Sequence, residues 1–100
     1  MQCEHWDRGA CRSCRYLDVP YGEQVAAKSE TAAEALALVP TAAGVHWLSP
    51  RRSAPTAFRT SAKLVVGGTR RRPTLGILGP DRRGVDLPGC PIQHPAINRA

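Results

Sequence analysis

Small and apolar residues recur at three- and four-residue intervals in the middle of the chain. The positions in this pattern are Val25, Ser29, Ala32, Ala33 and Leu36. Because an α-helix repeats every 3.6 residues, this spacing places them on one helix face. We expect a helix over residues 22–39, ended by Pro40, which cannot continue the hydrogen-bond pattern.

Residues 57–67 follow a different pattern, the two-residue alternation typical of a strand. Phe58, Thr60, Ala62, Leu64 and Val66 point one way, and Arg59, Ser61, Lys63 and Val65 the other. A basic hairpin tip at Arg70–Arg72 then leads into strands expected at 74–78 and 85–87. The predicted fold class is therefore α+β, with one helix and a β-hairpin or antiparallel sheet over residues 57–90.

Composition limits how much of this fold a hydrophobic core can stabilise. The 100 residues suit one small domain, but Leu, Ile, Val and Phe together number only 19 and the net charge is +6. Such a chain buries little apolar surface against its loss of conformational entropy. A bound metal, a partner or a further part of the protein must contribute to stability.

The charge is concentrated in the second half of the chain. Residues 1–50 carry four Lys or Arg against six Asp or Glu, whereas residues 51–100 carry ten against two. Twelve of the 14 basic residues are Arg, whose planar guanidinium suits phosphate contacts. The second half is thus expected to face a polyanion.

Neither a signal peptide nor a membrane span is predicted. Polar residues follow Met1, and the longest strictly apolar run is Ala35–Val39. We expect a cytoplasmic protein that does not bind membranes. In that compartment, four Cys in a short chain favour metal or cluster binding over disulfides.

The cysteines form a C-x7-C-x2-C cluster at Cys3, Cys11 and Cys14, with a distant Cys90 followed by Pro91. Three clustered Cys and one remote Cys-Pro favour a four-Cys iron–sulfur cluster. Zinc, completed by His5 or His94, and unligated or disulfide-bonded Cys are the alternatives. Either metal would close a loop of about 75 residues and so stabilise the fold.

Several motifs, in order along the chain, resemble the beginning of bacterial 23S ribosomal RNA uracil-C5 methyltransferases. They are Met1-Gln2-Cys3, Cys11-Arg12-Ser13-Cys14, Glu23-Gln24 with Ala27-Lys28, Phe58-Arg59 with Ala62 to Val66, Leu75-Gly76-Ile77-Leu78, and Asp86-Leu87 with Cys90-Pro91. The similarity is to the short type, which lacks a TRAM domain. Two departures are Arg59-Thr60-Ser61, where the family commonly has Arg-Asn-Lys, and Arg15, where it has Gln.

The resemblance implies that Cys3, Cys11, Cys14 and Cys90 hold a [4Fe–4S] cluster in a domain that helps recognise RNA. It also implies a C-terminal Rossmann-like domain that binds S-adenosylmethionine and supplies the catalytic residues. No glycine-rich methyltransferase loop occurs in the 100 residues. We therefore expect an N-terminal fragment of such an enzyme, without a catalytic residue of its own.

Within this fragment we expect three segments: a Cys-rich loop at 1–18, the helix at 22–39, and the hairpin region with the fourth Cys at 57–90. Phe58, Arg59 and Lys63 are the predicted contacts to 23S rRNA, because Arg59 and Lys63 would share a strand face. A monomer is expected. The alternatives are a stand-alone metal-stapled RNA-binding module and a zinc-bound protein-interaction domain.

Overall fold

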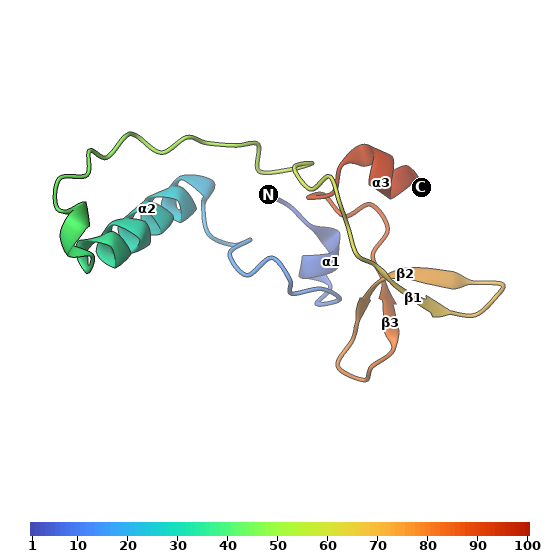
Figure 1. The fold of residues 1–100 in the computed structure, drawn as a ribbon. Helices are drawn as coiled ribbons and strands as arrows, with labels where there is room; N and C mark the ends of the chain where they lie inside the picture. The colour runs from blue at the N-terminus through green and yellow to red at the C-terminus, as the bar shows by residue number, and fades with distance from the viewer. The chain divides into compact units, whose positions relative to one another are not determined.

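The computed structural model describes all of residues 1–100, which form two compact units. The cysteine unit comprises Met1–Arg15 and Ala54–Ala100, and the helical unit comprises Tyr16–Ser53. The elements are drawn in Figure 1. An α+β fold is confirmed, since the chain contains helices and a three-stranded antiparallel sheet.

The helical unit is built on α2, Tyr21–Ala37, which confirms the expected helix to within two residues at each end. At its start the Pro20 carbonyl accepts hydrogen bonds from the amides of Glu23 and Gln24. The Gln24 side chain donates to the carbonyls of Tyr16 and Val19, at 2.8 and 2.9 Å. These bonds tie the preceding loop to the first turn. Pro40 begins the short 3-10 helix η1, Pro40–Ala42.

The sheet of the cysteine unit has strand order β1-β2-β3 and only antiparallel pairs. The strands are β1 Val65–Gly68, β2 Pro73–Leu78 and β3 Gly84–Asp86. The two expected strands after the basic tip are thus confirmed. The tip itself is a tight turn, with reciprocal backbone hydrogen bonds between Thr69 and Arg72 at 3.0 and 3.1 Å.

The strand expected from residue 57 is wrong for residues 57–64, because regular pairing begins only at Val65. β2 is six residues long, and its register with β1 ends at the Val65–Gly76 pair. The last two residues of β2, Ile77 and Leu78, pair with β3 alone, so the preceding segment is not paired with β2. Its one bridge is instead a parallel pair between Arg59 and Gln93. Arg59 and Lys63 therefore do not share the face of a regular strand, although both are exposed.

Two short helices were not expected. Helix α1, Glu4–Asp7, lies within the segment predicted as a Cys-rich loop, and α3, Pro95–Arg99, closes the described chain. The His94 side chain caps α3 by accepting a hydrogen bond from the Ala96 amide at 3.2 Å. Pro95 occupies the first helical position, where its missing amide has no cost.

The buried side chains lie at one place in the cysteine unit. They are Cys3, His5, Ile92 and Gln93. No residue of α2 is buried, and the strands carry only half-buried or exposed side chains. The small core predicted from composition is therefore confirmed. Its residues come from the segment around Cys3 and from the segment that follows Cys90. None of the helices combines the length and the hydropathy that a membrane span requires.

Gly76 gives a test of how tightly the sheet is built. Gly76 is buried in the central strand, and a Cβ atom there would overlap the Val85 carbonyl oxygen and lie 3.1 Å from the Leu87 side chain. Gly76→Ala should lower the free energy of unfolding by about 1–3 kcal/mol, the usual cost of overpacking. Urea unfolding measures this loss. Val66→Ala is the control, because Val66 on the neighbouring strand is 72% exposed and its truncation should cost far less.

Candidate metal centre

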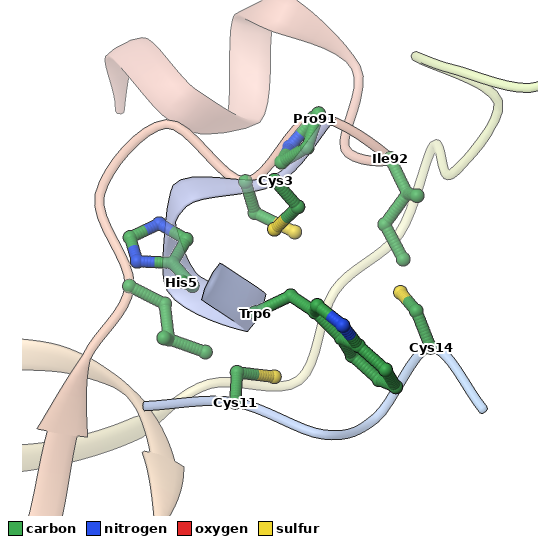
Figure 2. A pocket seen from close by; sticks show the side chains of 9 residues that line it. Cys3, His5, Trp6, Cys11, Cys14, Pro91 and Ile92 are labelled. Carbon is green, nitrogen blue, oxygen red and sulfur yellow. The ribbon is translucent and has the colours of Figure 1, made fainter. Parts of the chain in front are cut away.

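The four cysteines line one hollow of the cysteine unit, together with His5, Trp6, Leu87, Pro91 and Ile92. Figure 2 shows the sulfur atoms of Cys3, Cys11 and Cys14 turned toward this common space. All four thiols are free, so no disulfide joins them. The fold thus brings Cys90 to the three cysteines near the N-terminus across most of the sequence.

Each cysteine reaches the hollow from a differently held backbone. Cys3 is the N-cap of α1, and its carbonyl accepts hydrogen bonds from the amides of Trp6 and Asp7, both at 3.0 Å. Arg12, between Cys11 and Cys14, places its guanidinium carbon 4.5 Å from the centre of the Trp6 ring. This cation–π contact holds the Cys11–Cys14 loop against α1.

Cys90 follows a turn in which Gly89 has φ +67°, a backbone conformation that glycine adopts without strain. The Cys90 carbonyl accepts two hydrogen bonds, from the Gln93 amide at 3.1 Å and from Asn98 Nδ2 at 3.0 Å. Helix α3 therefore supports the fourth cysteine. The signal missed in the sequence was Pro95 after His94, a pair that suits a helix start.

The electrostatics of Cys14 reflect its neighbours. Partial burial raises the pKa of the Cys14 thiol, and the charges of Cys90, Cys11 and Cys3 raise it further, whereas Arg59 lowers it. Four thiolates in one hollow would repel one another. The positive charge of a bound metal ion or cluster iron would offset that repulsion.

The two histidines that could have completed a zinc site are already hydrogen-bonded. His5 Nε2 lies 2.7 Å from the Pro88 carbonyl oxygen, and His94 Nδ1 accepts from Ala96. His5 lines the hollow beside the cysteines, whereas His94 is not among the lining residues. As the side chains stand, no group of three or more His, Cys, Asp or Glu is arranged to hold a metal ion.

The predicted RNA-contact residues lie on the surface. Phe58 is 54% exposed, and Arg59 and Lys63 are exposed as well. Arg59 is nevertheless fixed at its backbone: its amide donates to the Ile92 carbonyl at 2.9 Å, and its carbonyl accepts from the His94 amide at 2.8 Å. This pairing joins the Arg59 segment directly to the residues that follow Cys90.

Comparison with known proteins agrees with the resemblance that the sequence motifs indicate. A curated relative from Halothiobacillus neapolitanus is 44% identical over 100 residues, one from Photorhabdus laumondii 43% over 96, and one from Xenorhabdus nematophila 42% over 96. The chain spans about a quarter of their length, 25%, 24% and 25% respectively. No family model and no solved structure matches the chain.

The chain is similar to 23S rRNA uracil-C5 methyltransferases over 94–100% of its own length, and it matches only their N-terminal quarter. The three relatives all carry the name 23S rRNA (uracil(747)-C(5))-methyltransferase RlmC.

Asn98 tests whether α3 supports Cys90. Asn98→Asp replaces the amide donor with an oxygen, so that the Cys90 carbonyl loses a partner and meets a second acceptor. The free energy of unfolding should fall by about 0.5–1.5 kcal/mol, the usual net contribution of one hydrogen bond. Urea unfolding of this variant is to be compared with that of Arg99→Gln, a change at an exposed position of the same helix. Equal stability of the two variants would contradict a supporting role for α3.

Proposed function

We propose that residues 1–100 are the cluster-binding and RNA-recognition part of a 23S rRNA uracil-C5 methyltransferase. In this proposal Cys3, Cys11, Cys14 and Cys90 hold a [4Fe–4S] cluster. The observation that carries it is the convergence of all four thiols on one hollow, in a chain related to rRNA methyltransferases. In the whole protein, S-adenosylmethionine and the catalytic residues would belong to another domain. The protein is expected to be a cytoplasmic monomer.

The donor set fits a cluster for a chemical reason. Iron–sulfur clusters are held by cysteine thiolates, and the other side chains of the hollow include the apolar Leu87, Pro91 and Ile92. When bound, the cluster would supply four Fe–S bonds that cross-link the two ends of the cysteine unit. Because the buried side chains are so few, this cross-link would provide much of the folding free energy. Its role in the fragment is structural.

The cluster proposal predicts brown protein after anaerobic purification, with about four irons and four sulfides per chain. Replacing any one of the four cysteines by Ser should make the cluster labile or lose it, with loss of compact structure. Ser13→Ala is the control, since Ser13 lies between Cys11 and Cys14, is exposed and should keep the full iron content. Iron and sulfide analysis, with circular dichroism, measures both effects.

Two results would contradict this assignment. Colourless protein with one stoichiometric zinc after anaerobic reconstitution would replace the cluster by a zinc site. A Cys90→Ser protein that kept its full iron content and its stability would remove Cys90 from the ligand set.

RNA recognition is proposed for Phe58, Arg59 and Lys63. Arg59 and Lys63 are exposed cations, and the backbone of Arg59 is held in place by Ile92 and His94. A cation on a fixed backbone loses less conformational entropy when it contacts a phosphate than one on a mobile backbone. Exposed Phe58, next to Arg59, offers a ring on which an unpaired base could stack.

The RNA proposal predicts that affinity for single-stranded or looped rRNA segments falls steeply with salt. Each phosphate contact contributes about 0.7 to the slope of log affinity against log salt. Replacing Arg59 and Lys63 together by Gln should lower the affinity and reduce the slope by about 1.4, without unfolding. The comparison variant replaces Arg70, Arg71 and Arg72 at the hairpin tip. If the double variant bound as tightly as the parent at low salt while the tip variant lost binding, the tip would be the contact.

A further inference from the structure

His5 is an ionisable side chain that is buried in a protein with very few buried side chains. Only 5% of its surface is exposed, and both ring nitrogens have partners. Nε2 lies 2.7 Å from the Pro88 carbonyl oxygen, and Nδ1 lies 3.4 Å from Arg8 Nη2. An arginine nitrogen only donates and a carbonyl oxygen only accepts. The partners therefore define a neutral ring that accepts at Nδ1 and donates its Nε2 proton to Pro88.

The backbone of His5 holds a second cysteine segment. Its carbonyl accepts a hydrogen bond from the Cys11 amide at 3.1 Å. Cys3 stands two residues before His5, and the Cys3 carbonyl is bonded to the first turn of the same short helix. His5 thus binds Cys11 through its own carbonyl, and it lies in the short helix whose first turn is bonded to Cys3.

The side chain of His5 reaches the remaining segment across 83 positions of sequence. Pro88 and Gly89 form the turn that presents Cys90, and Gly89 takes the left-handed conformation there. The C-terminal end of that turn is fixed by two hydrogen bonds, because the Cys90 carbonyl accepts from Gln93 and Asn98. The His5–Pro88 hydrogen bond fixes the N-terminal end of the turn, at Pro88.

We propose that His5 is a positioning residue that assembles Cys3, Cys11 and Cys90 around the hollow before any cluster is bound. Both ring nitrogens are engaged, so His5 acts through hydrogen bonds and not as a ligand. Its effect on cluster uptake rests on the proposed function. Its effect on the approach of the thiols does not, and can be measured in the metal-free chain.

The test compares three substitutions. His5→Gln keeps an N–H donor at the distance of Nε2 from the backbone, His5→Asn moves the donor to the position of Nδ1, and His5→Ala removes it. Each is made in a chain in which Cys11 and Cys14 are Ser, so that Cys3 and Cys90 are the only thiols. The same chain in urea gives the cross-linking rate without structure, and a parent no faster than this would overturn the proposal. The probe is a short bifunctional thiol reagent applied to metal-free protein. Alkylation by a monofunctional reagent controls for the reactivity of each thiol.

We expect the Gln variant to cross-link within about twofold of the parent, and the Asn and Ala variants to be about three- to tenfold slower, the range set by loss of one buried hydrogen bond. Parent-like cross-linking in the Ala variant would overturn the proposal. So would a Gln variant as slow as Ala, whether through lost positioning or lost folding.

Cluster reconstitution in chains with all four cysteines separates this inference from the proposed function. If His5 positions the ligands, the Gln variant should take up iron at the parent's rate and the Asn variant more slowly. A parent chain that binds no cluster would contradict the proposed function alone, because the cross-linking rates would still decide the role of His5.

Discussion

The contact between the Cys3 segment and the Cys90 segment is the one on which the cysteine unit depends. The buried side chains are contributed by these two segments alone, Cys3 and His5 from one and Ile92 and Gln93 from the other. The sheet, by contrast, exposes much of its apolar surface, including Val66, Leu75 and Leu78. A fold with so little buried surface is marginal unless a further interaction joins its ends. The thiols stand where such an interaction would act on both segments at once.

The local elements could be predicted from sequence because their signals are local. The 3.6-residue spacing indicates α2, and the Gly, Pro and Arg punctuation indicates the turns around β2. The alternation from Phe58 to Leu64 predicted a strand that does not form, because alternation says how side chains would point and not whether a partner strand is available. Here the pairing of β1 with β2 begins only at Val65, and the segment before it pairs with residues 91–94 instead.

The candidate site also contains both residues that the sequence could predict and residues that it could not. The cysteine spacing was enough to predict that four thiols belong together, since a two-residue spacing and a Cys-Pro pair are recognisable without a structure. The role of His5 was not predictable, because its partner is a backbone carbonyl, which every residue has, 83 positions away. Asn98 was missed for the same reason. Support of a ligand through main-chain atoms leaves almost no trace in residue types.

The helical unit, residues 16–53, is inserted between two pieces of the cysteine unit. It makes up about half of the 75 residues that separate Cys14 from Cys90. Because the entropy of closing a loop grows only with the logarithm of its length, halving or doubling this span changes the closure free energy by about 0.6 kcal/mol. The stretch from 16 to 53 is therefore a permissive site for evolutionary insertion and deletion. A ring closed through Cys14 and Cys90 would keep nearly the same stability if this stretch were shortened or lengthened.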